Sequence, residues 1–218
     1  TSAASTNEAD GESSINDDWL NQFEKEASQK STKEMQLLFG RILAGEIQRP
    51  SSYSIKTVKL LGELDTKAAQ IFRRLCSTTI SLRNGNSVLD ARTPSLGKNA
   101  ASNSLLSYGL SFDKLNVLHE YGLIIPDYNS YRDYRMCIVN AQKQVPLPFM
   151  HQGQLWCLEP TSEREPNQEE RVNGVALSHS GRELLRIVDI DPVEKYTAAL
   201  TEHFKKRNLT IRLLAPPT

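Results

Sequence analysis

The chain has 218 residues, and 39% of them are hydrophobic, which is enough to bury a core in a protein of this size. Its 26 basic and 26 acidic residues give a formal net charge of +0, so no overall charge draws it to nucleic acid or to an anionic membrane. No stretch approaches the roughly 18 apolar residues of a membrane span. Cys76, Cys137 and Cys157 are odd in number and lack metal-type spacing, so we expect reduced thiols in a cytoplasmic protein.

Residues 1–14 are small, polar and without periodicity, which predicts a flexible leader. The chain has no initiating Met, and we expect that a natural N-terminal portion is missing.

Residues 15–80 carry helical patterns and predict a helical bundle. Ser31 and Glu34 have the spacing of a capping box, and the helix that follows should end before Pro50. Its apolar positions recur at steps of three and four and predict one buried stripe: Met35, Leu38, Phe39, Ile42, Leu43 and Ile47. Asp65 is the expected N-cap of a later helix. Short connections between these helices favour antiparallel neighbours.

Small residues interrupt this stripe at Gly40, Ala44 and Gly45. A glycine in a helix interior costs roughly 1 kcal/mol relative to alanine, so something should offset that cost. Close packing of a neighbouring helix is the simpler explanation. A binding site for a partner, lined by exposed backbone, is the alternative.

The second half changes in character. Residues 81–104 contain Asn84-Gly85-Asn86 and Thr93-Pro94 and read as a connecting segment. Residues 105–190 resemble a winged helix, with strand candidates at 135–140, 154–158 and 172–177 and a strand-to-helix step at 177–184. Residues 191–218 predict a C-terminal helix and strand. The predicted fold class is α+β, mainly α: an N-terminal helical bundle followed by a winged-helix-like α/β portion.

A winged helix would make DNA binding a candidate function. A recognition helix needs donors that face the major groove and cations for phosphates. Asp113 and Glu120 weaken the positive charge of the candidate helix, so packing or protein contact is the favoured use of this part. The candidate nucleic-acid contacts are Lys114, Asn116, His119, Arg132 and Arg135.

Catalytic and metal-binding patterns are weak. The four histidines are scattered, and the chain has no HExxH pattern, no phosphate-binding P-loop and no GxGxxG. We therefore expect no catalytic residue, no cofactor and no metal site. Glu46 is a candidate buried partner of a nearby arginine, and the expected interaction site or buried polar cluster comprises Trp19, Arg41, Glu46 and Tyr53.

Four motifs resemble an uncharacterised bacterial family, the domain of unknown function DUF2806. They are Asp17-Asp18-Trp19-Leu20, Ser31 to Gln36, Arg41 to Ile47, and Pro50 to Ser54. Ser51-Ser52-Tyr53-Ser54 departs mildly from the Gly-Ser-Phe-Ser that the family often has after the proline. The resemblance covers about residues 15–75 strongly, and it implies no substrate and no catalytic residues. The helical core is also loosely similar to proteins of abortive infection against phage.

These observations favour a non-catalytic interaction or sensing module that binds a protein partner or associates with itself. Two alternatives stay open: a winged-helix DNA-binding regulator, and a component of a phage-defence system.

Overall fold

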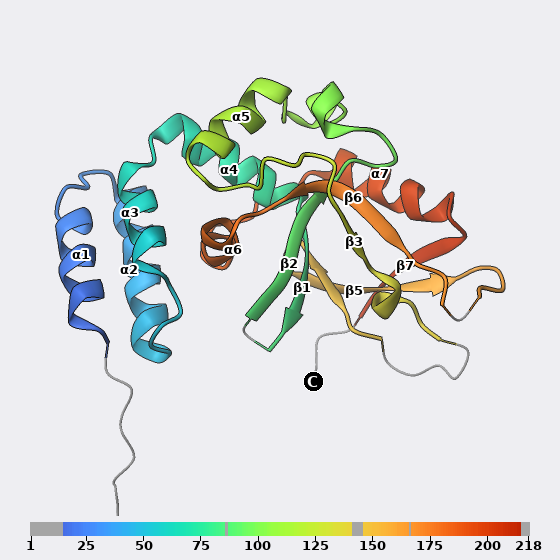
Figure 1. Ribbon diagram of the computed structural model, residues 1–218, viewed down its shortest axis with the longest axis horizontal. Helices are drawn as coiled ribbons and strands as arrows, with labels where there is room; N and C mark the ends of the chain where they lie inside the picture. Colours follow the sequence, from blue (N-terminus) through green and yellow to red (C-terminus); the bar gives the residue numbers. More distant parts are fainter. Residues whose placement is uncertain (1–14, 86, 141–145, 166, 215–218) are drawn as a thin grey trace, which may run out of the picture. The chain divides into compact units, whose positions relative to one another are not determined.

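The computed structural model describes residues 15–85, 87–140, 146–165 and 167–214. The chain divides between Gly62 and Glu63 into two compact units. We call the part up to Gly62 unit 1 and the part from Glu63 unit 2. Each unit has its own set of elements (Figure 1).

The described part of unit 1 is built from three helices: α1 (Asp17–Ala27), α2 (Lys33–Gln48) and α3 (Ile55–Glu63). The side chain of Asn16 caps α1, and that of Thr32 caps α2, one residue later than the predicted cap. Aromatic rings join α1 to α2, because Trp19 stacks on Phe23 with ring centroids 5.3 Å apart and Phe23 meets the Phe39 ring edge-on. These buried rings form the core of unit 1 together with Ile42, Val58 and Leu61.

Unit 2 contains a seven-stranded sheet in the order β3-β6-β2-β1-β4-β5-β7, in which all neighbouring strands run antiparallel. The sheet curls into a half-barrel (Figure 1). Its strands are β1 (Ile80–Asn84), β2 (Ser87–Pro94), β3 (Tyr131–Asp133), β4 (Phe149–His151), β5 (Gln154–Pro160), β6 (Arg171–Ala176) and β7 (Leu209–Leu213).

Four α-helices accompany the sheet within the described part of unit 2: α4 (Thr66–Thr78), α5 (Phe112–Glu120), α6 (His179–Leu185) and α7 (Glu194–Lys205). The short 3-10 turns are η1 (Ala100–Ser102), η2 (Leu106–Tyr108) and η3 (Arg135–Cys137). α4 packs against β2 and α5, and α7 packs against β7. The core between them includes the fully buried side chains of Leu75, Ile80, Leu82, Phe149, Tyr196 and Phe204.

Two glycines of unit 2 allow close approach of backbone segments. A Cβ on Gly174 would lie 2.1 Å from the carbonyl oxygen of Thr93 on the neighbouring strand. A Cβ on Gly181 would lie 2.1 Å from the carbonyl oxygen of Leu123. Contacts this short are impossible, so only glycine lets β6 pair with β2 and lets α6 begin where it does.

The predicted fold class, a helical bundle followed by a winged helix, is wrong. β1 and β2 lie largely within 81–104, where we expected a connection. In the sheet, β2, β1 and β4 stand between β6 and β5, so the two strands expected to form a wing are not neighbours. The third strand candidate, from Arg135, instead begins with the 3-10 turn η3. The strand-to-helix step at 177–184 does occur, with Ser178 as N-cap of α6, but in this different architecture.

Candidate interaction site

The turn after α2 is held by a buried polar cluster of Trp19, Glu46 and Tyr53. Glu46 is only 2% exposed, and its carboxylate accepts hydrogen bonds from the backbone N–H groups of Ser51, at 2.5 Å, and Tyr53, at 3.0 Å. The indole N–H of Trp19 donates to the Tyr53 carbonyl oxygen at 2.8 Å. Ser51 adopts the left-handed backbone region, with φ 65°. The cluster therefore fastens the end of α2 to α1 and fixes which side of α2 is buried.

Arg41, the fourth residue expected in this cluster, is half-buried on α2. The Glu46 carboxylate accepts from the two backbone N–H groups just described.

The two glycines of α2 have different surroundings. A Cβ on Gly45 would lie 2.8 Å from Cε2 of the buried Tyr53 ring, so the turn packs directly on this position. A Cβ on Gly40 would meet nothing within 4 Å. Close packing thus explains Gly45, although the neighbour is a turn and not a helix. Nothing within the described residues explains Gly40.

Gly40 belongs to an exposed apolar face of α2. Phe39, Ile42 and Glu46 mark the buried side of this helix. The opposite side carries four small or apolar residues at steps of three, four and three, which places them in one row. We call this row the α2 outer face: Leu37, Gly40, Ala44 and Ile47. The side chains of Leu37 and Ile47 are 53% and 61% exposed.

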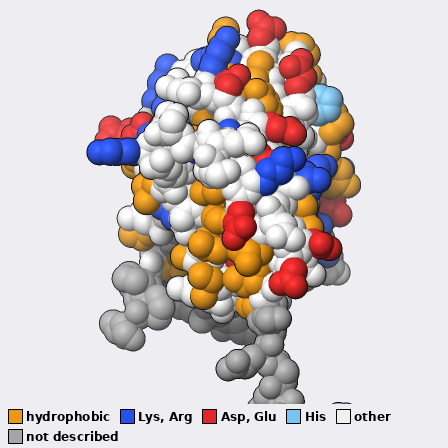
Figure 2. Space-filling view, turned by 90° about the vertical axis from the view of Figure 1, so that its left-hand side faces the viewer, with side chains coloured by type: hydrophobic (Ala, Val, Ile, Leu, Met, Phe, Trp, Pro, Cys, Tyr) orange, Lys and Arg blue, Asp and Glu red, His pale blue; other side chains and the backbone are white. Residues whose placement is uncertain are grey.

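The exposed residues of α2 that flank this row are Lys33, Glu34, Gln36 and Gln48, so a cation and a carboxylate both stand near its N-terminal end. The last turn of α2 contains no basic residue, but the exposed Arg49 follows at the C-cap, where a cation offsets the negative end of the helix dipole. Figure 2 shows hydrophobic side chains gathered on the lower part of the face that unit 1 presents in this view.

The residues predicted to contact nucleic acid are spread over several elements, and three of them make side-chain contacts within the fold. On α5, Lys114 donates to the Gly109 carbonyl oxygen, and Asn116 accepts from the Tyr128 hydroxyl. His119 is exposed near the end of the same helix. Arg132 lies on β3, where it pairs with Val172, and Arg135 forms an ion pair with Asp133 at 3.1 Å.

Lys114 does approach two further cations. Together with Lys67 and Arg74 of α4 it lines a hollow of about 370 Å³. Arg74 donates to the Tyr108 carbonyl oxygen at 2.7 Å, and Lys114 donates to that of Gly109 at 2.9 Å. Arg74 and Lys114 therefore hold the turn between η2 and α5 in place.

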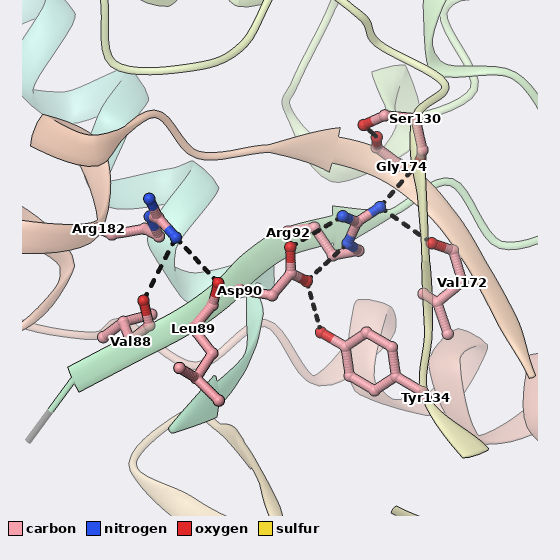
Figure 3. A network of polar contacts seen from close by, with 9 residues as sticks. All are labelled: Val88, Leu89, Asp90, Arg92, Ser130, Tyr134, Val172, Gly174 and Arg182. Atoms are coloured by element: carbon pink, nitrogen blue, oxygen red, sulfur yellow. Dashed lines mark hydrogen bonds and ion pairs between the residues drawn. The ribbon is translucent and has the colours of Figure 1, made fainter. Parts of the chain in front are cut away.

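A buried charged network lies in the sheet of unit 2 (Figure 3). Asp90 and Arg92, two residues apart on β2, form two hydrogen bonds at 2.8 and 2.9 Å. Arg92 also donates to the carbonyl oxygens of Ser130 and Val172, and Tyr134 donates to Asp90. Burial, and after it the Asp90 carboxylate, raise the pKa of Tyr134 well above its ordinary value. The network joins β2, β3 and β6, which is a structural role.

The other groups that often do chemistry are also occupied or buried. His151 Nδ1 lies 3.0 Å from the Thr79 carbonyl oxygen and Nε2 lies 3.1 Å from the Thr197 hydroxyl, and burial lowers its pKa. The three cysteines are free and buried. Burial raises the pKa of Cys76, and it raises the pKa of Cys137 to about 12.

Two further features are absent from the described residues. Residues 15–214, apart from the gaps stated above, hold no group of three or more His, Cys, Asp or Glu side chains that could bind a metal ion. In the same part of the chain, each helix is too short or too polar to cross a bilayer.

Comparison with known proteins places the chain in a family. The family model described as "Protein of unknown function (DUF2806)" matches residues 1–201. The chain belongs to this family. No curated protein and no solved structure matches it. Membership confirms the family that the four motifs resemble, and it brings no substrate and no assigned residue.

The α2 outer face was missed in the sequence. Ile47 was assigned to the buried stripe, although its side chain is mostly exposed. The available signal was a second set of helical spacings, from Leu37 to Ile47, on the side opposite Phe39 and Ile42.

Proposed function

We propose that this protein is a non-catalytic interaction module and that the α2 outer face is its binding surface. The observation that carries the proposal is an apolar row on an exposed helix face that has Gly40 at its centre, with open space above that glycine. Single exposed apolar residues are ordinary on protein surfaces, whereas contiguous exposed apolar patches mark contact surfaces.

The energetics support binding at this face. Complete burial of a Leu or Ile side chain is worth about 1.5–3 kcal/mol, and Leu37 and Ile47 each still expose more than half of their surface. A partner that covers them would recover a large part of that free energy. Gly40 costs roughly 1 kcal/mol in an isolated helix, and close approach of a partner backbone at this position would offset it.

The DNA-binding alternative has less support. It depended on a recognition helix within a winged fold, and the described residues form a different architecture. Of its candidate residues, Lys114, Asn116 and Arg135 make contacts within the chain.

Photo-cross-linking tests the proposal. A photoreactive amino acid replaces Ala44 in cells that naturally express the protein, and the same amino acid at Lys59, which is exposed on α3, serves as the control. We expect a defined cross-linked protein from position 44 and not from position 59. Purified, that protein should bind the chain, and Ile47→Glu should abolish binding. The matched variant Leu89→Glu, at an exposed leucine of unit 2, should not. Equal products from both positions, or binding unaffected by Ile47→Glu, would refute the proposal.

A further inference from the structure

Three arginines of unit 2 meet where α6 packs against the β1–β2 hairpin. Arg83 lies on β1 and pairs with Val88 on β2. The guanidinium of Arg182 on α6 donates to the carbonyl oxygens of Val88, at 3.4 Å, and Leu89, at 2.9 Å (Figure 3). Arg186 follows Arg182 by four residues, one turn along the same side of the helix. The arginines on α6 therefore lie over the strands that carry Arg83.

Two of these guanidinium groups have a buried nitrogen without a hydrogen-bond partner among the described residues. These atoms are Nε of Arg83 and Nε of Arg182. A buried donor left unpaired costs free energy, so such an atom in a folded protein calls for an acceptor from elsewhere. Burial, and after it the charge of Arg186, lower the pKa of the Arg83 guanidinium. The fold thus holds neighbouring cations together and leaves part of their hydrogen-bonding capacity unused.

The carboxylates around these arginines do not neutralise them. Residues 80–89 contain no acidic residue, and Asp90, which follows, is held by Arg92 and Tyr134. On α6, Glu183 is buried and pairs with His179 at 2.8 Å. Asp189 is exposed in the segment after α6, where Arg186 also interacts within the chain. Three arginines against this one remaining carboxylate leave an excess of positive charge.

We propose that Arg83, Arg182 and Arg186 bind a phosphate group that carries two negative charges, either inorganic phosphate or a phosphomonoester. Such a group has a charge of about −1.5 to −2 at neutral pH and three acceptor oxygens, which suit several guanidinium groups at once. A carboxylate has one charge and two oxygens and would satisfy fewer donors. The site lies in unit 2 and does not depend on the proposed binding surface of unit 1.

Calorimetric titration tests this binding. The chain is titrated with inorganic phosphate and with glycerol 3-phosphate, each up to about 10 mM, with potassium chloride added to keep the ionic strength constant. We expect one saturable site, and the tighter ligand of the two tells whether the group is free or esterified. Arg83→Gln and Arg186→Gln should each weaken binding by at least about tenfold, because each removes charge-assisted donors.

The control variant is Arg132→Gln, at an exposed arginine on β3, and it should leave the affinity unchanged. A chain that binds neither compound would overturn the proposal. An Arg83→Gln chain that binds as tightly as the unaltered chain would overturn it as well.

Thermal unfolding guards against misfolding as an explanation. Without phosphate, Arg83→Gln should unfold at a temperature no lower than that of the unaltered chain, because the change removes a cation that lies near Arg186. Added phosphate should raise the unfolding temperature of the unaltered chain by mass action, and it should not raise that of Arg83→Gln. An Arg83→Gln chain that unfolds at a lower temperature without phosphate would show that Arg83 is satisfied within the chain, and the proposal would fail.

The charge of the ligand provides a second test. The second pKa of phosphate is about 6, so a fall from about pH 7.5 to about pH 5 removes one of its two charges, while arginine stays protonated. We expect binding to weaken by at least about tenfold. Among the groups beside the arginines, His179 can gain positive charge at the lower pH, and Glu183 and Asp189 can lose negative charge. Both changes would strengthen the binding of an anion, so a weaker affinity reports the ligand itself.

Dimethyl phosphate separates this site from a nucleic-acid surface. It is a diester with one charge, like the phosphates of nucleic acid, and it should bind at least about tenfold more weakly than glycerol 3-phosphate. An affinity that does not change with pH, or that is equal for the diester, would overturn the assignment to a doubly charged phosphate.

Discussion

The two glycines of α2 provide a matched test of the packing around this helix. We expect Gly40→Ala to stabilise unit 1 and Gly45→Ala to destabilise it, although both changes add the same methyl group to the same helix. The difference arises from the surroundings: open space at Gly40, and the buried Tyr53 ring at Gly45.

The magnitudes follow from two effects. Replacing a helix-interior glycine by alanine is worth about 0.5–1 kcal/mol, and at Gly40 nothing opposes this gain. At Gly45 the new Cβ would lie 2.8 Å from the Tyr53 ring, whose backbone is held by Glu46 and Trp19. Overpacking of this kind costs about 1–3 kcal/mol, which exceeds the gain in helix propensity. The two variants should therefore differ by about 2 kcal/mol in the free energy of unfolding of unit 1.

Urea unfolding followed by the fluorescence of Trp19 measures this difference. Trp19 is buried in unit 1, and Trp156→Phe removes the other tryptophan, which lies in unit 2. Measurements at about 1 µM chain keep self-association from adding to the apparent stability. Equal stabilisation by both alanines would refute the packing of Tyr53 on Gly45. A destabilising Gly40→Ala would refute the open space at Gly40.

Three further predictions concern the buried polar groups. Glu46→Gln should lower the free energy of unfolding of unit 1 by about 1–3 kcal/mol, because one amide N–H₂ would face a backbone N–H, and the same urea titration measures it. Asp90→Asn should destabilise unit 2 by about 3–5 kcal/mol by leaving buried Arg92 without its counter-charge, whereas Tyr134→Phe should cost only about 1 kcal/mol; equal effects in thermal unfolding would contradict this ranking. Burial, with the cations at 206 and 207, lowers the pKa of His203 to about 4, so the neutral ring is favoured in the folded state. The neutral His203 ring therefore contributes stability above pH 6.5, and this stability is lost as the pH falls through about 4. His203→Gln should make the fall in the free energy of unfolding between pH 6.5 and pH 4 shallower. Identical pH profiles of unfolding for the two chains would argue against the lowered pKa of His203.

The helices of the first half could be predicted because their signals are local. Asp65 caps α4, as expected. The helix α2 ends at Gln48 because Arg49, the residue before Pro50, is pushed out of the helical region of backbone conformation. The expected cap at Ser31 was wrong by one residue because Thr32, which can also cap a helix, lies next to it.

The sheet was missed because its signals were read as a loop. The run Asn84-Gly85-Asn86 is typical of a hairpin turn, and β1 and β2 do pair on either side of it, up to Asn84 and Ser87. Without β1 and β2, the strand candidates at 135–140, 154–158 and 172–177 were too few for a large sheet and predicted only a small wing. The strands β2 and β6 pair although they lie some 80 residues apart in the chain, and no local sequence pattern predicts which distant strands become neighbours.

By itself, the sequence determined the family, the helices of unit 1 and the position at which α2 ends, since caps, proline and helical periodicity act over a few residues. Only the tertiary structure decided that Asp90 and Arg92 are buried as a pair, and that Gly40 and Gly45 of α2 have different surroundings. Burial depends on what the rest of the chain brings alongside a residue. For Gly45 that neighbour is the Tyr53 ring, and for Gly40 the described chain brings none.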